Sequence, residues 1–336
     1  MNHHPENDQA AITPALQTVL QELRSFDAFD ASTTIRRKAE KLNRYLRASK
    51  LSSCVVAVSG GVDSALVLAL VCHASRQAES PIQAIVPVLL PVFDKQAATN
   101  QDTATQRALE LCRGQHVRPV VVDLTTAHQA TKTLVDKALG VEGKGWASGQ
   151  LVAYQRTPAL YYITSLLSQQ GRPGLVVGTT NEDEGAYLGF FGKASDGLVD
   201  IQLLSDLSKH RVYELARQLQ VPDSILQATP TGDMYDGRVD EQVFGAPYDF
   251  VELFLRSKKT PRRVHAALDR LDEGDQERFA LLNARLEELH AYNHHKYLGR
   301  SPAVHLDLFD VRFAGSWSYA VFEPENLQPL QRDVEL

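Results

Sequence analysis

The stretch from Val55 to Leu70 constrains the fold more than any other part of the chain. Residues 54–58 form a short apolar run rich in β-branched side chains, which predicts a buried strand. Ser59, Gly60 and Gly61 predict a tight turn, since both glycines can adopt positive φ. An apolar, alanine- and leucine-rich helix is predicted from Asp63 onward. A strand, turn and helix in this order aim backbone N–H groups and the positive helix end at one point, which favours phosphate binding.

The turn lacks both the lysine of the G-x-x-x-x-G-K-[ST] loop and the spacing of the G-x-G-x-x-G loop. Its six residues, Ser59 to Ser64, resemble instead the S-G-G-x-D-S PP-loop of the ATP pyrophosphatases. Enzymes of that superfamily split ATP between the α and β phosphates and activate an acid as an adenylate. The alternative is a turn in which Ser59 and Asp63 merely cap the helix. We expect phosphate binding, because the complete pattern follows a strand.

Composition excludes several classes of protein. The chain has 336 residues, enough for one large domain or two smaller ones with an ample core. Its net charge is −6, which disfavours binding to a nucleic-acid backbone. No run of apolar residues is long enough to cross a membrane, and the first thirteen residues lack a signal core. Cys54, Cys72 and Cys112 have no metal or redox spacing, so we expect buried thiols in a cytoplasmic protein.

Strands and helices are predicted to alternate along the chain. Strands are expected at 54–58, 82–90, 117–122 and 175–178, with the second broken by Pro87. Helices are expected at 14–23, 33–48, 63–76, 99–113, 125–139, 151–169 and 207–220. This order predicts an α/β fold, a Rossmann-like parallel sheet with helices on both faces. Ligands of such sheets bind at the carboxyl ends of the strands.

A second group of polar residues follows the fourth predicted strand. The acidic run at 182–184 is in isolation typical of a helix N-terminus. Because Asp63 and Glu184 both follow strand ends, we predict that each gives one carboxylate to a Mg²⁺ ion carried by ATP. Ser205 and Asp206 are expected to cap the next helix, whose first turn contains Lys209. A cation there opposes the helix dipole unless an anion such as pyrophosphate lies nearby; the alternative is a solvated lysine.

From Gly178 onward the chain resembles the NAD⁺ synthetases, which amidate deamido-NAD⁺. The matching positions are Gly178-Thr179, Asn181, Glu184, Gly189 to Gly197, Asp200-Ile201, Leu207-Ser208-Lys209, Pro230 to Met234, Asp240-Glu241, Gly245 and Tyr248. The resemblance extends in order over about residues 50–255, and weakly to His295-Lys296. It implies an ammonia-dependent ligase that forms a C–N bond, uses ATP and Mg²⁺, and assembles as a homodimer with the fold of the adenine nucleotide alpha hydrolases.

The resemblance also implies roles for individual residues. The catalytic residues would be Asp63, Glu184, Asp196 and Lys209, and the Mg²⁺ ligands Asp63 and Glu184. ATP would be bound by Ser59, Gly60, Gly61, Val62, Asp63, Ser64, Arg156, Thr179, Lys209 and Thr231. Deamido-NAD⁺ would be bound by Gln150, Phe190, Lys193, Asp196, His295 and Lys296. Asp196 would lie at the nicotinate end and help to receive ammonia.

Several positions depart from the family pattern. In the N-x-x-A-R-x-R stretch, Gln150 replaces the asparagine and Tyr154 replaces the first arginine. Gly192, Ala194 and Ser195 replace threonine, tyrosine and glycine, Val243 replaces an acidic residue, and one residue is inserted between Glu184 and Gly189. We expect phosphate chemistry to survive these changes, and the details of dinucleotide binding to be altered.

Three parts of the chain are predicted: a tail with helices at 1–50, an NAD⁺ synthetase-like domain at 51–255, and a helical C-terminal extension at 256–336. The extension is expected to pack on the same domain or at a dimer interface. About fifty residues precede the first strand and contain no cysteine, so we expect free ammonia as the nitrogen donor unless a separate subunit supplies it. The glycine-containing loops at 140–149 and 228–245 are candidate lids.

Two other functions stay open at this point. One is a different PP-loop adenylating enzyme that modifies tRNA, which the acidic balance and the lack of a Cys-x-x-Cys pair disfavour. The other is a non-catalytic nucleotide-binding homologue, which Tyr154 and the altered 192–195 stretch leave possible.

Overall fold

The computed structural model describes residues 11–93, 101–232, 237–297, 300–309 and 318–321. Within this part, seven parallel strands form one sheet in the order β3-β2-β1-β4-β5-β6-β7. Their bounds are β1 Ser53–Ala57, β2 Ala84–Leu89, β3 Val120–Val121, β4 Gly174–Gly178, β5 Ile201–Gln202, β6 Arg300–His305 and β7 Ser318–Val321. The predicted α/β fold with a parallel sheet is therefore confirmed.

The helices lie between and around these strands. They are α1 Pro14–Ser25, α2 Ala31–Ala48, α3 Val62–Ser75, α4 Gln101–Gly114, α5 Thr125–Leu139, α6 Trp146–Gln169, α7 Glu182–Gly185, α8 Lys209–Gln218, α9 Asp223–Leu226, α10 Asp240–Phe244, α11 Tyr248–Lys259, α12 Pro261–Leu268, α13 Glu273–Asn293 and the 3₁₀ helix η1 His294–Tyr297. No helix in the described ranges is long and apolar enough to span a bilayer.

Side chains of β1 alternate between two apolar cores, as expected for a strand that is buried on both faces. Cys54 and Val56 pack with α2, α3 and α8 in one core, where α3 is buried nearly all round. Val55 packs on the opposite face with residues of α6 such as Leu160 and Leu167. Helices therefore cover both faces, and the β1–α3 turn is held at the carboxyl edge of a fully buried strand.

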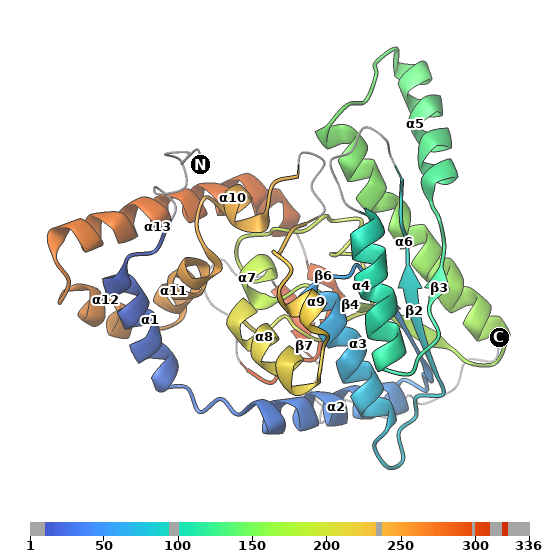
Figure 1. Ribbon diagram of the computed structural model, residues 1–336, viewed down its shortest axis with the longest axis horizontal. Helices are drawn as coiled ribbons and strands as arrows, with labels where there is room; N and C mark the ends of the chain where they lie inside the picture. Colours follow the sequence, from blue (N-terminus) through green and yellow to red (C-terminus); the bar gives the residue numbers. More distant parts are fainter. Residues whose placement is uncertain (1–10, 94–100, 233–236, 298–299, 310–317, 322–336) are drawn as a thin grey trace.

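A third core joins the two ends of the chain. Leu16, Val19, Leu20 and Leu23 of α1 pack with residues of α10 to α13, and Leu282 and Leu286 of α13 are fully buried there. Figure 1 shows α1, α11, α12 and α13 together at one side of the sheet. We call α1 and α10–α13 the helical layer. Leu282 and Leu286 therefore make α13 part of the core.

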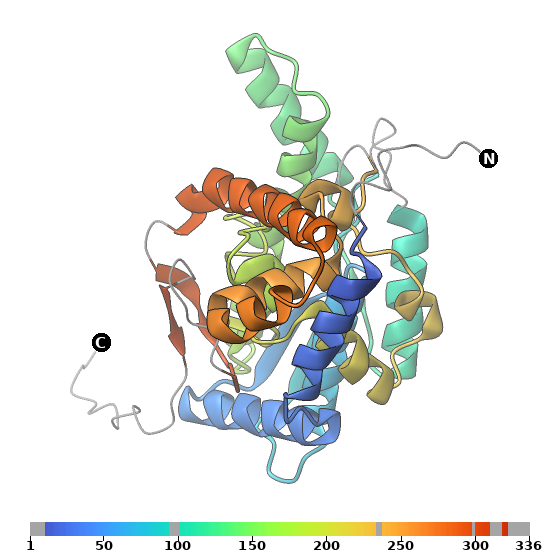
Figure 2. The same ribbon diagram turned by 90° about the vertical axis from the view of Figure 1, so that its left-hand side faces the viewer.

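Two strands correct the prediction of a helical C-terminal extension. α12 and α13 are helices as predicted, whereas Arg300–His305 and Ser318–Val321 extend the sheet beyond β5. Their place at the edge of the sheet is visible in red in Figure 2. Neither segment shows a clear strand pattern in the sequence, because each depends on pairing with its neighbour rather than on local propensity.

Pro87 does not break the second strand, contrary to the prediction. It lies within β2 opposite Val56, and pairing with β3 begins only one residue later, at Val88. The oxygen of Val88 accepts from the amide of Val58, just after β1, and that of Leu89 accepts from Val122, on the β3 side. Backbone groups alternate between the two sides of a strand, so the nitrogen of Pro87 points toward the β3 side. Pairing with β3 begins only at Val88, so the missing N–H of Pro87 costs no hydrogen bond between strands.

The predicted loop at 140–149 is shorter than expected, since α6 begins at Trp146 rather than at Leu151. Figures 1 and 2 show α5 and the first turns of α6 projecting from the rest of the molecule. Mobility of this loop and of the loop at 228–245 stays a prediction, and residues 233–236 of the latter lie outside the described residues.

Candidate active site

The turn between β1 and α3 is braced by its own hydroxyl groups. Ser64 Oγ donates to the oxygen of Gly61 at 3.0 Å and accepts from the Ser59 amide at 3.2 Å. Gly60 has φ +83°, whereas Gly61 has φ −92°, so only one of the two glycines uses the left-handed region. Among the described residues, no side chain caps α3. The capping alternative for Ser59 and Asp63 is therefore wrong, and the first amides of α3 lack a side-chain acceptor.

We predict that Gly60→Ala destabilises the protein by about 2–5 kcal/mol, because the left-handed backbone disfavours a Cβ and the new methyl would overpack. The added Cβ would lie 2.3 Å from the oxygen of Ala104 in α4. Urea unfolding measures the effect. Gly61→Ala is the matched control, since its nearest contact would be 3.5 Å and its φ is negative. Equal stability losses in the two variants would refute this account of the turn.

A buried lysine joins the two predicted metal-binding carboxylates. Lys209 Nζ, at the first position of α8, lies 2.6 Å from Asp63 Oδ2 and 3.1 Å from Glu184 Oε1. Asn181, after β4, donates to Asp63 Oδ1 at 2.8 Å and accepts from the Glu184 amide at 3.0 Å. Burial alone would lower the pKa of Lys209, but Asp63 and Glu184 raise it above its usual range. Residues from three strand ends thus meet at one point.

A side chain of the protein itself lies at the start of α8, where the sequence suggested an anion such as pyrophosphate. Asp183 Oδ2 accepts from the Lys209 amide at 2.7 Å, and burial raises the pKa of Asp183 well above its usual range. The helix begins after Ser208 rather than after Ser205 and Asp206, which corrects the predicted cap. Asp206 instead pairs with the buried Lys38 of α2 and accepts from the Leu308 amide, so it anchors the chain after β6.

Tyr248 and Asp240 complete this cluster; both match the family pattern, from which no chemical role was predicted for either. The hydroxyl of Tyr248 lies 2.9 Å from Glu184 Oε1 and 2.8 Å from Asp240 Oδ2. A phenol carries one hydrogen, so it donates to only one of the two carboxyl groups at a time. Burial raises the pKa of Glu184 to about 7 and also raises that of Asp240. The two carboxyl groups can therefore share a proton through Tyr248.

The donor set fits a divalent cation on its solvent side. The side chains of Asp63 and Glu184 are 19% and 15% exposed, whereas that of Lys209 is 4% exposed and lies beneath them. Among the described residues, Glu184 Oε2 accepts no hydrogen bond, and no three His, Cys, Asp or Glu side chains form a ready metal cage. Two carboxylates with water are nevertheless a usual set for Mg²⁺ bound to phosphates.

The loop between β4 and β5 holds the predicted substrate residues in two different ways. Lys193 and Asp196 are exposed, and Asp196 Oδ2 accepts from Ser195 Oγ at 3.3 Å. Phe190 packs edge-on against Phe244 of α10, with ring centroids 4.8 Å apart. Its ring therefore belongs in part to the third core.

Lys296 holds this loop within the same chain. Its Nζ donates to the oxygens of Gly189 at 2.8 Å and Phe191 at 2.7 Å, and burial lowers its pKa to about 8. His295 is exposed, and its Nδ1 lies 3.2 Å from the oxygen of Tyr292. The structure thus gives Lys296 a local role in fixing the loop, while a substrate contact by His295 stays a prediction.

Two departures from the family pattern are neighbours in space. Tyr154 and Gln150 lie one turn apart on α6, and the hydroxyl of Tyr154 donates to Gln150 Oε1 at 3.0 Å. A Cβ on Gly192 would lie 3.5 Å from the Tyr154 ring and 2.2 Å from Ser195 Oγ. The family has a larger residue at the first position of the 192/195 pair and glycine at the second. In this chain the small residue is at 192 and the larger one at 195, so the two departures compensate each other in volume. We call this pair a matched change.

We predict that Gly192→Thr alone lowers substrate affinity about tenfold, because the new side chain must displace Ser195 beside Asp196. Gly192→Thr combined with Ser195→Gly should recover most of the affinity, since the clash is removed. Titration of deamido-NAD⁺ into each variant measures both effects. Additive losses in the double variant would contradict the matched change.

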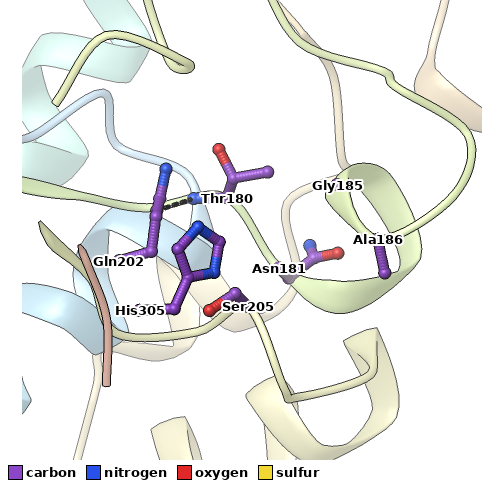
Figure 3. A pocket seen from close by; sticks show the side chains of 7 residues that line it. All are labelled: Thr180, Asn181, Gly185, Ala186, Gln202, Ser205 and His305. Atoms are coloured by element: carbon purple, nitrogen blue, oxygen red, sulfur yellow. Dashed lines mark hydrogen bonds between the residues drawn. The ribbon is translucent and has the colours of Figure 1, made fainter. Parts of the chain in front are cut away.

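The remaining predicted residues lie at the edges of this region. Thr179 is half-buried after β4, Arg156 is on α6, and the hydroxyl of Thr231 is exposed, 3.4 Å from the oxygen of Arg238. A small cavity lies behind the cluster, lined by Thr180, Asn181, Gly185, Ala186, Gln202, Ser205 and His305 (Figure 3). It has room for about one water-sized molecule and is too small for a nucleotide.

Comparison with known proteins identifies the family. A curated relative, the NH₃-dependent NAD⁺ synthetase of Burkholderia cenocepacia, is 31% identical over 274 residues, which cover 79% of this chain and 93% of the relative. That of Thermoplasma acidophilum is 32% identical over 221 residues, 65% of this chain and 81% of the relative. The crystal structure of NAD⁺ synthetase from Burkholderia pseudomallei matches with a TM-score of 0.60 and 25% identity, covering 86% of this chain and 99% of that one. The NAD synthase family model matches residues 34–288, most of the chain, and the protein belongs to that family.

Proposed function

We propose that this protein makes NAD⁺ from deamido-NAD⁺, ATP and ammonia, with release of AMP and pyrophosphate. The observation that carries the proposal is the contact of Lys209 with both Asp63 and Glu184 beside the uncapped start of α3. Membership of the NAD synthase family supports this reaction over tRNA modification by another PP-loop enzyme. Relatives named as NH₃-dependent enzymes support ammonia as the nitrogen donor.

In the first step, a carboxylate oxygen of the nicotinate ring attacks the α-phosphorus of ATP, and the bond to the bridging oxygen of pyrophosphate breaks. The amides at the start of α3 and the Lys209 ammonium would stabilise the charge that moves onto pyrophosphate. These groups are fixed before the reaction, since Asn181 and Asp183 hold the side chain of Asp63 and the backbone of Lys209. No protein nucleophile is required.

In the second step, the nitrogen of ammonia attacks the acyl carbon and the bond to AMP breaks. The nitrogen must then lose a proton, and Asp196 is the exposed carboxylate of the 189–197 loop that could accept it. Gln202 Nε2 donates to the backbone oxygen of Asp196 at 3.1 Å, so β5 fixes the position of this residue. Exclusion of water at this stage would prevent hydrolysis of the adenylate.

Mg²⁺ bound by Asp63 and Glu184 would neutralise phosphate charge and so promote departure of pyrophosphate. The electrostatics of the cluster support this requirement. Even with one proton shared between Glu184 and Asp240, the three carboxyl groups carry two negative charges against the one positive charge of Lys209, so a polyanionic triphosphate would be repelled without an added cation. Asp63 is held by Asn181, and Glu184 by Tyr248, so both carboxylates are oriented beforehand.

The test is mass detection of NAD⁺ from deamido-NAD⁺, ATP, Mg²⁺ and ammonium, with glutamine replacing ammonium in a parallel reaction. We expect NAD⁺ and equimolar pyrophosphate with ammonium, and little product with glutamine. Binding of ATP without product in either reaction would favour the non-catalytic homologue. Pyrophosphate release that depends on tRNA would instead assign the site to another PP-loop enzyme.

We further propose a homodimer in the cytoplasm. The projecting α5–α6 pair and its connection expose Leu134, Leu139, Val141 and Trp146, an apolar surface that a second copy would cover. The three free cysteines are all buried, in keeping with a reducing compartment. Light scattering of the purified protein would test the assembly, and a monomer at micromolar concentration would argue against it.

A further inference from the structure

A second cation lies against the phosphate-binding turn, on the opposite side from Lys209. Arg107 of α4 donates from Nε to the oxygen of Gly60 at 3.0 Å. The same helix touches the turn closely, because a Cβ on Gly60 would meet the oxygen of Ala104. Figure 1 shows α4 beside α3, the helix that begins at this turn. Arg107 is thus anchored on the turn by one of its three nitrogens.

The rest of the guanidinium is uncommitted. Within the described ranges, the two terminal nitrogens of Arg107 make no hydrogen bond, and no carboxylate pairs with it. Lys209 differs, since both Asp63 and Glu184 engage its ammonium. A half-buried guanidinium fixed by Nε presents its remaining N–H groups as a planar fork, the geometry that binds phosphate oxygens in pairs.

The order of the strands indicates which part of ATP would meet Arg107. The loop with Asp196 joins β4 to β5, whereas α4 follows β2, on the other side of β1. The α-phosphate must face the acid substrate and therefore the β4–β5 side. Lys209, after β5, lies on that side as well and would meet the pyrophosphate oxygen next to the α-phosphate, so the phosphate chain would run from there across the turn toward α4. We propose that Arg107 binds the terminal phosphates of ATP and the pyrophosphate that leaves.

This inference rests on the proposed function for the direction of the phosphate chain. The experiment compares ATP, pyrophosphate and AMP by calorimetric titration of the full-length protein. In Arg107→Met, which keeps the apolar stem, we expect affinity for ATP and pyrophosphate to fall about 10- to 100-fold and affinity for AMP to change less than about threefold. Arg107→Lys should fall between, because it keeps the charge but loses the planar fork.

Arg113→Met is the matched control, since Arg113 is an exposed arginine in the last turn of the same helix. It should leave all three affinities unchanged. An equal loss for AMP and ATP in Arg107→Met would mean that Arg107 only shapes the turn through Gly60, and would overturn the proposal; so would an unchanged affinity for ATP. A wild-type protein that binds ATP but forms no NAD⁺ would refute the proposed function. The affinities of the variants for ATP, pyrophosphate and AMP could still be compared in that case.

Discussion

Replacing Asp63 by asparagine is expected to reduce pyrophosphate release by about 100- to 1,000-fold, the usual cost of losing one fixed charge at a site of developing charge. The variant keeps the shape of the side chain, and Asn181 can still donate to the remaining oxygen at the position now 2.8 Å away. What is lost is one negative charge beside Lys209 and one proposed ligand for Mg²⁺. The Mg²⁺ concentration needed for half-maximal release should rise as well.

Asp102→Asn provides the control for this variant. Asp102 is also an acidic residue in the first turn of a helix, α4, but its side chain is exposed and makes no ion pair among the described residues. Its replacement should leave pyrophosphate release within about twofold, because an isolated surface charge contributes little. Release by Asp63→Asn at more than a third of the wild-type rate would remove Asp63 from the chemistry.

The parts of the site that the sequence predicted well are those built by neighbouring residues. Strand, turn and first helical turn lie within residues 53–64, so local pattern and propensity point to one structure. The place of Glu184 followed from the rule that parallel strands present their carboxyl ends at one edge. Because β1 and β4 are neighbours in the sheet, the same rule is enough to predict that Glu184 lies close to Asp63.

Other features depend on contacts that no local pattern encodes. Tyr248 reaches Glu184 from the helical layer, whose core unites α1 with helices more than 200 residues later. From the sequence, the helices of this layer were divided among three predicted parts: α1 in 1–50, α10 and most of α11 in 51–255, and α12 and α13 in 256–336. β5 has only two residues and is a strand because β4 and β6 flank it. In the sequence Asp183 is one of three consecutive acidic residues. The structure shows that it is buried, whereas the side chain of Glu184 is partly exposed.

The helical layer also supplies a physical link between the ends of the chain and the site. Arg24 of α1 pairs with Asp249 and Glu252 of α11, both at 2.6 Å. α11 begins at Tyr248, so this pairing fixes the helix whose first residue contacts Glu184 and Asp240. The N-terminal helix therefore stabilises the site without contributing a residue to it.

Lys209→Gln should produce the other large effect, on both stability and activity. Loss of the ammonium leaves Asp63 and Glu184 facing each other in a largely buried site, and breaking such a pair costs about 3–5 kcal/mol. Pyrophosphate release should fall at least 100-fold, because the fixed cation near the leaving group is lost. Lys132→Gln is the control of the same residue type, since the Lys132–Asp136 pair is on the projecting α5. It should cost less than about 1 kcal/mol.

The stability loss in Lys209→Gln should depend on pH in a defined direction. In the folded protein burial raises the pKa of Glu184 from 4.5 to about 7, while Lys209 lowers it. A carboxyl group with a raised pKa makes the protein less stable as pH rises from its unfolded pKa to its folded pKa, by about 1.4 kcal/mol per unit. Without Lys209 the folded pKa is higher still, so this loss continues above pH 7. The loss of unfolding free energy in the variant should therefore be smaller at pH 6 than at pH 9, as urea titrations would measure. A difference independent of pH would show that the carboxylates do not depend on Lys209 for their charge.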